Sequence, residues 1–201
     1  MGRVGAIGIA DALAVLLAQP ASAADRQIRP FLGVTFAGDT TIVDLESATG
    51  SPHATFGVNA AVLWDIVGVD VDLGRTGGFF ESGDKHLVLS SSVTTLTGNL
   101  VLAAPRRLTE YSLRLYFVAG GGMMRVAKVD YFDVFDIDDV VPAFDVGAGA
   151  IGFVTNKVGV SWEIRRFESL GGSNQLAGLT IGGARERLTF WRASMALVVR
   201  Y

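Results

Sequence analysis

Apolar and polar residues alternate along most of the chain from residue 29 onward, which is the period-two pattern of β-strands. The segment Val67–Arg75 shows this most cleanly, because Val or Leu occupies one face while Gly, Asp and Gly fill the other. Seven further segments follow the same rule. The expected strands are Pro30–Gly38, Thr55–Trp64, Val67–Arg75, Ser92–Ala103, Leu113–Val126, Ala143–Val154, Val158–Phe167 and Leu188–Tyr201. The pattern therefore predicts an all-β chain.

The connections between these strands alternate between long and short. The long connections are residues 39–54, 76–91, 127–142 and 168–187, and the shorter ones are residues 65–66, 104–112 and 155–157. Transmembrane β-barrels have long outer loops and short periplasmic turns. The sequence therefore predicts an eight-stranded antiparallel up-and-down transmembrane β-barrel with both termini on the periplasmic side.

The polar face of the strands has the composition expected of a narrow interior. Its small residues are the glycines at 57, 68, 74, 120, 147 and 149, and its charges are Asp70, Asp72, Asp145 and Glu163 with Arg114, Arg165 and Arg192. Small residues fit the limited space inside a small barrel, and the opposite charges can pair across it. Aromatic residues near strand ends, expected to form girdles at the membrane interfaces, are Phe31, Trp64, Tyr111 and Tyr201. We therefore expect lipid outside and a polar lumen.

Composition excludes several classes of protein. The 201 residues include no cysteine, which excludes disulfides, thiolate zinc sites and a cysteine nucleophile. No run of about 20 apolar residues occurs, so a helical membrane protein is excluded. A net charge of -3 argues against nucleic-acid binding. The low charge and abundant apolar residues argue against a disordered chain.

Residues 1–23 have the features of a secretory signal peptide, leaving 24–201 as the barrel domain. Arg3 provides the positive start, residues 7–18 are mostly apolar, and Ala21-Ser22-Ala23 is a small-x-small cleavage site. Asp11 interrupts the apolar stretch. The alternative is a buried N-terminal helix.

The final segment resembles the last strand of bacterial outer-membrane barrels, because Tyr201 is aromatic and apolar residues precede it at every second position. The pattern over residues 29–201 is similar to small eight-stranded barrel domains of the OmpA transmembrane type. The segments carrying this similarity are Arg29–Gly33, Phe56-Gly57-Val58, Phe117–Gly122, Gly147-Ala148-Gly149 and Trp162–Phe167. The resemblance implies an outer-membrane location, surrounding lipid and lipopolysaccharide, and recognition of the strand ending in Tyr201 by the barrel assembly machinery.

The sequence contains no convincing catalytic constellation. His53 and His86 both fall in long connections, and no spacing aligns either with a serine and a fixed acid. A rim hydrolase is the alternative to solvated loop histidines. Gly120-Gly121-Gly122 lacks the following Lys-Ser/Thr of a phosphate loop, so a bend or bulge is expected there. We expect no enzyme, no catalytic residue and no cofactor.

Two clusters of charged residues have both a structural and a functional interpretation. The acidic run Asp130, Asp133, Asp136, Asp138 and Asp139 is expected to be a solvated loop, with a divalent-cation site as the alternative. Glu163 and Arg165 lie two positions apart and share a face, which predicts a salt bridge in the lumen; the alternative is a selectivity or gating pair. No metal site is predicted.

The leading hypothesis is a non-enzymatic outer-membrane barrel with a plugged polar lumen and a structural or loop-mediated role. Two alternatives remain. One is a narrow channel or a barrel that binds lipids or small molecules in the same membrane. The other is a soluble periplasmic carrier of the lipocalin type, which requires the apolar faces to point inward.

Overall fold

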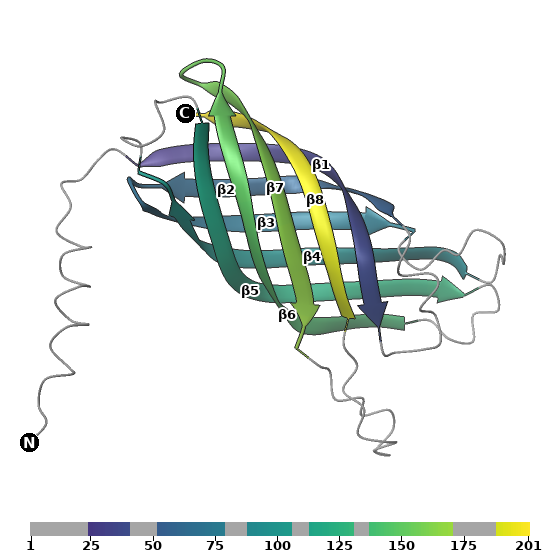
Figure 1. Cartoon of the computed structure of the whole chain (residues 1–201). Helices are drawn as coiled ribbons and strands as arrows, with labels where there is room; N and C mark the ends of the chain where they lie inside the picture. Colours follow the sequence, from purple (N-terminus) through teal and green to yellow (C-terminus); the bar gives the residue numbers. More distant parts are fainter. Residues whose placement is uncertain (1–23, 41–51, 79–87, 106–112, 131–136, 171–187) are drawn as a thin grey trace, which may run out of the picture.

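The computed structural model describes residues 24–40, 52–78, 88–105, 113–130, 137–170 and 188–201, which form a closed barrel (Figure 1). Its strands are β1 (Asp25–Thr40), β2 (His53–Leu63), β3 (Val67–Gly77), β4 (Val88–Ala103), β5 (Leu113–Asp130), β6 (Ile137–Phe153), β7 (Val158–Ser169) and β8 (Leu188–Arg200). No helix in this part of the chain is long and apolar enough to cross a membrane.

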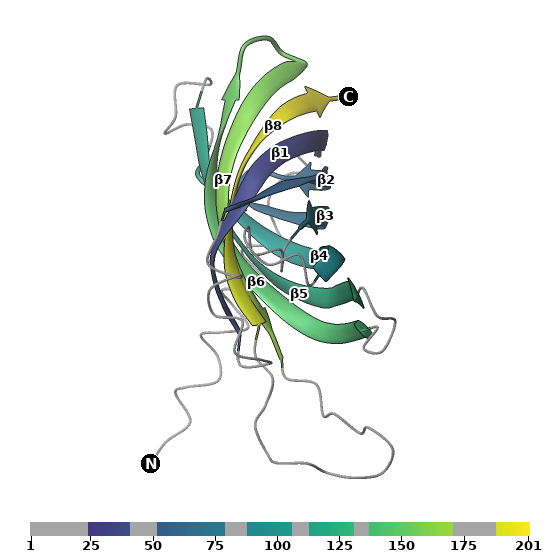
Figure 2. The same ribbon diagram turned by 90° about the vertical axis from the view of Figure 1, so that its right-hand side faces the viewer.

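Each strand pairs antiparallel with its neighbour in the chain, and β1 pairs with β8 to close the barrel. The strands are strongly tilted, so that β7 and β8 on one wall cross β3 and β4 on the opposite wall in Figure 1, and Figure 2 shows their curvature around the lumen. The register of β1 against β8 shifts between Phe36 and Asp39, where Ala37 has a φ of 49°. The eight-stranded antiparallel barrel is thus confirmed.

All eight expected strands are present, but several are longer than the side-chain alternation indicated. β1 begins at Asp25 rather than Pro30, and β6 begins at Ile137 rather than Ala143. β4 starts at Val88, although the following Ser90, Ser91 and Ser92 show no alternation of apolar and polar residues. Main-chain pairing depends on hydrogen bonds and continues where the apolar pattern lapses. Strand ends are therefore the part of the architecture that alternation locates least well.

The apolar face points outward, as β3 shows. Val69, Val71 and Leu73 are 42%, 53% and 44% exposed, whereas Asp70 and Asp72 are 2% and 0% exposed. Trp64 and Tyr201 are exposed near strand ends, as expected of interface aromatics. The expectation for Phe31 was wrong, because this ring is buried in the lumen. Because β1 starts at Asp25, Phe31 lies inside the strand rather than at its end, and it shares the inward face with Asp25, Gln27 and Arg29. Tyr111 lies outside the described residues.

The glycines at 120–122 form no β-bulge, because β5 pairs without interruption through them with β4 and β6, and Figure 1 shows that β5 curves along its length. At Gly120 a Cβ atom would lie 2.1 Å from Asn99 Oδ1 and 2.2 Å from the Gly98 carbonyl oxygen. Gly98 faces outward, and a Cβ there would meet nothing within 4 Å. Gly120 therefore provides space for neighbouring lumen groups.

We expect Gly120→Ala to destabilise the barrel by about 1–3 kcal/mol, because the added methyl group overpacks the lumen. The matched variant Gly98→Ala should change stability by no more than about 0.5 kcal/mol. The free energy of unfolding in urea, measured for the refolded chain in lipid vesicles, checks both values. Equal effects of the two variants would contradict the inward position of Gly120.

Candidate functional site: the charged lumen

The lumen holds two apolar clusters, one towards each end, with a layer of charged residues between them. The cluster nearest the long connections comprises Val93, Met124, Ala143, Phe167, Leu188 and Phe190. The cluster nearest the short turns comprises Leu63, Val101, Ala103, Tyr116, Val118, Ile151 and Val198. The interior therefore differs from the polar lumen that the sequence predicts, because part of it is apolar. Some of its apolar members, such as Val101 and Ala103, lie in continuous apolar runs (here Leu100–Ala103), where alternation gives no signal.

Arg165 on β7 is the centre of the charged layer and is fully buried. Its guanidinium lies 3.0 Å from Asp70, 3.0 Å from Asp145 and 2.5 Å from Glu163. A carboxylate oxygen of Asp72 lies 3.9 Å away. Removing charges from water is costly unless each is paired and hydrogen-bonded. The sequence-predicted pair of Glu163 and Arg165 is confirmed, within a larger cluster than expected.

Arg192 on β8 forms the second ion pair of this layer. Its Nη2 atom donates hydrogen bonds of 2.9 and 2.8 Å to the two carboxylate oxygens of Asp72. The guanidinium lies between two aromatic rings, 4.4 Å from the centroid of Phe31 and 4.8 Å from that of Phe167. Gly74 makes room for it, because a Cβ there would lie 2.5 Å from Arg192 Nη1. The surrounding strands thus restrict this guanidinium on several sides.

Hydrogen bonds and one cation–π contact link the charged layer to the half of the lumen nearest the short turns. Tyr116 donates its hydroxyl hydrogen to Glu163 at 2.8 Å, and the guanidinium of Arg29 lies 5.4 Å from the centroid of the Tyr116 ring. Arg29 in turn donates two hydrogen bonds, of 2.9 and 2.7 Å, to Gln27. Gln27 donates to Asp25, which pairs with Arg200 at 2.7 Å. Sequence reasoning missed Arg29, Gln27 and Asp25 because the first strand was expected to start later.

Arg114 does not join the charged cluster in the manner expected from its inward register. Its guanidinium donates to main-chain carbonyl oxygens of Trp64 at 2.9 Å, Asp65 at 2.6 Å and Ala104 at 3.2 Å. These carbonyls belong to the ends of the short connections. Arg114 therefore holds two of those turns together at the end of the lumen.

The remaining candidate residues of the sequence do not converge on a reactive centre within the described chain. His53 begins β2, and its carbonyl oxygen accepts a hydrogen bond from Thr35. Of the acidic run, Asp130, Asp138 and Asp139 lie at strand ends, contrary to the expected loop. His86, Asp133 and Asp136 lie outside the described residues. Among those described, no group of three or more His, Cys, Asp or Glu residues has a metal-binding arrangement.

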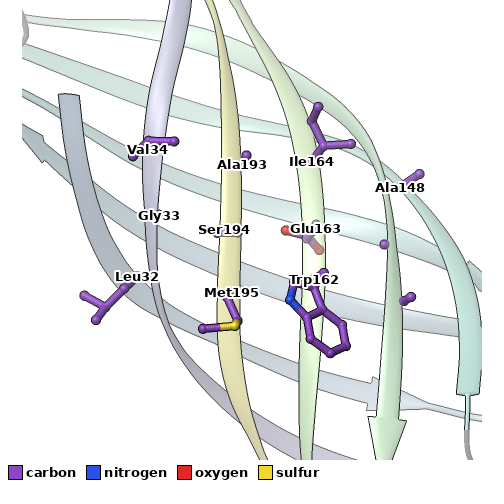
Figure 3. Close-up of a pocket in the computed structure, with 12 residues that line it drawn as sticks. Leu32, Gly33, Val34, Ala148, Trp162, Glu163, Ile164, Ala193, Ser194 and Met195 are labelled. Carbon is purple, nitrogen blue, oxygen red and sulfur yellow. The ribbon is translucent and has the colours of Figure 1, made fainter. Parts of the chain in front are cut away.

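An open groove of about 680 Å³ lies on the outer wall across β6, β7, β8 and β1 (Figure 3). Trp162, Met195 and Leu32 border it, and Ala148 and Ala193 form part of its floor. Glu163 belongs to the same strand as Trp162, but its carboxylate is bonded on the lumen side to Arg165 and Tyr116. The groove is thus an apolar surface with no polar group available from this carboxylate.

Comparison with known proteins identifies the architecture. No model of a known protein family matches the sequence, and neither does any curated protein. The crystal structure of Neisserial surface protein A superposes with a TM-score of 0.61 at 12% identity, covering 88% of this chain and 97% of that one. The N-terminal β-barrel domain of Pseudomonas aeruginosa OprF gives 0.53 at 13% identity, also over 88% and 97%. The chain has the fold of small eight-stranded outer-membrane β-barrels. The resemblance expected from the sequence is confirmed at the level of the fold.

Replacing Arg165 should destabilise the barrel strongly, because the buried carboxylates around it lose their main counter-charge. We expect Arg165→Met to cost about 3–5 kcal/mol in the free energy of unfolding. The matched variant Arg166→Met removes the adjacent, outward-facing arginine. The side chain of Arg166 is 45% exposed, and its guanidinium forms a loose ion pair of 3.7 Å with Glu168. This variant should cost no more than about 1 kcal/mol. Urea unfolding of both refolded variants checks this, and a small loss for Arg165→Met would contradict the central role of this residue.

Proposed function

We propose that the chain is an integral outer-membrane β-barrel with a closed lumen and a structural or loop-mediated role. The observation that carries this proposal is the inverted polarity of the barrel. Its buried interior holds Arg165 among carboxylates, while large apolar side chains cover the exterior of the strands. An apolar exterior is stable in the hydrocarbon of a membrane and unfavourable in water.

The same polarity disfavours the soluble carrier considered as an alternative. A carrier of apolar ligands needs an apolar cavity inside the barrel and polar side chains outside. Here the charged layer fills the middle of the lumen, and Leu32, Leu100 and Phe117 are 71%, 63% and 66% exposed on the outside. The small outer-membrane barrels that share the fold support the membrane assignment.

A closed lumen follows from the sizes of the inward side chains. Eight strands leave an interior just wide enough for side chains to fill, whereas aqueous porins use about 16–18 strands. Arg29, Arg165, Arg192 and Tyr116 are among the largest fully buried side chains described. Apolar clusters lie on both sides of the charged layer. We therefore place any specific activity in the connecting segments rather than in catalysis or bulk transport.

The proposed orientation puts both termini and the short turns in the periplasm. The start of β1 and the end of β8 lie together at the end of the barrel that carries the short turns: Arg200 donates its main-chain N–H to Lys157 and pairs with Asp25. The proposed partners are outer-membrane lipid, lipopolysaccharide and the barrel assembly machinery, which would recognise β8 and Tyr201. No nucleic-acid partner is proposed.

A narrow channel is the second candidate, and one observation favours it. Several buried polar atoms in the lumen have no hydrogen-bond partner, among them both amide atoms of Asn59 and one carboxylate oxygen of Asp145. Unsatisfied groups of this kind are sites for water or for alternative pairing. A lumen that rearranged its ion pairs around such groups would open briefly.

The direct test of the location is membrane fractionation combined with a gel that compares unboiled and boiled samples. We expect the chain in the detergent-extracted outer-membrane fraction, with altered migration after boiling. Recovery in the periplasm without detergent would overturn the proposal and favour the soluble carrier.

Introducing a charge on the outer face tests the lipid contact. We expect Val69→Arg to cost about 2–4 kcal/mol in lipid vesicles if Val69 lies near the membrane midplane. The control Val69→Leu keeps an apolar side chain, and Thr97→Ser retains a hydroxyl group on the lumen side. Both should be tolerated better in urea unfolding. Comparable losses for Val69→Arg and Val69→Leu would argue against lipid at this position.

The closed lumen predicts no steady, porin-sized conductance for the refolded monomer in planar bilayers. Brief small openings are compatible with it, because ion pairs rearrange. The combined variant Glu163→Gln with Arg165→Gln should then lower stability, without creating a persistent selective pore. Steady large steps from the verified monomer, with ion selectivity altered in that variant, would favour the channel instead.

A further inference from the structure

Three residues form a row across neighbouring strands on the outer face, towards the long connections. Arg75 on β3 lies opposite Thr94 on β4, and Thr94 lies opposite Arg125 on β5. Both arginines are exposed and Thr94 is half-buried. Because neighbouring strands are roughly 4.8 Å apart, the backbones of the two arginines are separated by about 10 Å. Two guanidinium groups on flexible side chains thus flank one hydroxyl group.

The row marks the edge of the apolar outer surface on these strands. From the row to the short turns, every outward-facing residue of β3, β4 and β5 is apolar or glycine. Leu73, Leu96 and Met123 form the adjacent row and are 44%, 41% and 53% exposed. The remaining outward positions are Val67, Val69, Val71, Gly98, Leu100, Leu102, Leu113, Leu115, Phe117, Ala119 and Gly121. A surface that changes from apolar to cationic at one row suits a membrane boundary.

We infer that Arg75, Thr94 and Arg125 bind the phosphate of a lipid headgroup in the outer leaflet, an inference that rests on the proposed membrane location. Guanidinium groups form paired, charge-assisted hydrogen bonds with phosphate oxygens. The hydroxyl of Thr94 supplies a further donor between them. The acyl chains of the same lipid then cover Leu73, Leu96 and Met123. The three residues would thus be a specific contact surface for the anionic lipid that the proposed function places around the barrel.

Arg166 on β7 provides a matched comparison on the same outer face. Its guanidinium lies 3.7 Å from the carboxylate of Glu168, which already supplies a negative charge. Its partners on the neighbouring strands are Val146 and Trp191, so no second cation lies directly beside it in the row. We therefore expect Arg166 to contribute little to phosphate binding.

The test measures lipid retention by the full refolded chain in a neutral detergent, using native mass spectrometry. The probe is phosphatidic acid, compared with diacylglycerol of the same acyl chains and with inorganic phosphate as a competitor. We expect retention of phosphatidic acid but not of diacylglycerol, with inorganic phosphate competing poorly because it lacks the acyl chains. Arg75→Gln with Arg125→Gln should weaken binding at least about tenfold, because the charge-assisted hydrogen bonds to the phosphate are lost.

Several variants keep the outcome interpretable. Arg166→Gln should leave binding unchanged. Arg75→Gln alone is included because Arg125 also interacts within the chain. The paired variant Arg75→Lys with Arg125→Lys retains both charges but loses the two-pronged hydrogen bonding of the guanidinium groups. Undiminished retention by the double Gln variant, or an equal loss in Arg166→Gln, would overturn the site. Unboiled-gel migration and vesicle insertion are scored in parallel: an inserted barrel without selective retention refutes only this site, whereas failed insertion of the unaltered chain refutes the proposed location.

Discussion

The rest of the barrel depends on the ion pairs that the buried guanidinium of Arg165 forms in the lumen. It joins carboxylates from β3, β6 and β7, and thus connects opposite walls of the closed sheet across the lumen. Paired charges of this kind are tolerated in a low-dielectric interior only when the geometry and additional hydrogen bonds compensate for lost hydration. The apolar clusters on both sides reduce access of water to the charged layer. Glycines at 74, 120, 147 and 149 leave the space that the long side chains occupy.

The polarity of the exterior follows from the same constraint. In a strand, successive side chains point to opposite faces, so every charged residue directed into the lumen places its neighbours outside. On β3 this puts Val69, Val71 and Leu73 on the surface next to the buried Asp70 and Asp72. The sequence can satisfy both faces only if the medium outside is itself apolar. The alternation of side chains therefore accounts together for the fold, the charged interior and the proposed membrane location.

Strand number, strand order and the direction of most side chains could be predicted from the sequence, because each depends on local alternation. The pairing across the lumen could not. Asp70 and Arg165 are 95 positions apart, and their contact depends on the stagger with which the sheet closes. Phe31 was misassigned because the mostly polar segment Asp25–Arg29 hides the start of β1. Arg114 was expected among the acids, but it donates hydrogen bonds to main-chain carbonyl oxygens of the short turns. Every residue has such a carbonyl, so the sequence does not indicate which ones act as acceptors.

Whether a barrel of this size conducts depends on how freely its central ion pairs exchange partners, and the described contacts restrict that exchange unequally. Arg192 lies between the rings of Phe31 and Phe167 and above Gly74, so movement of its guanidinium requires those rings to move as well. Glu163 has a second cation within reach: it accepts hydrogen bonds from Arg165 and Tyr116 and lies 4.0 Å from Arg192. A shift of this one carboxylate from Arg165 towards Arg192 would keep every guanidinium paired. Any rearrangement of the charged layer that keeps all its guanidinium groups paired therefore passes through Glu163.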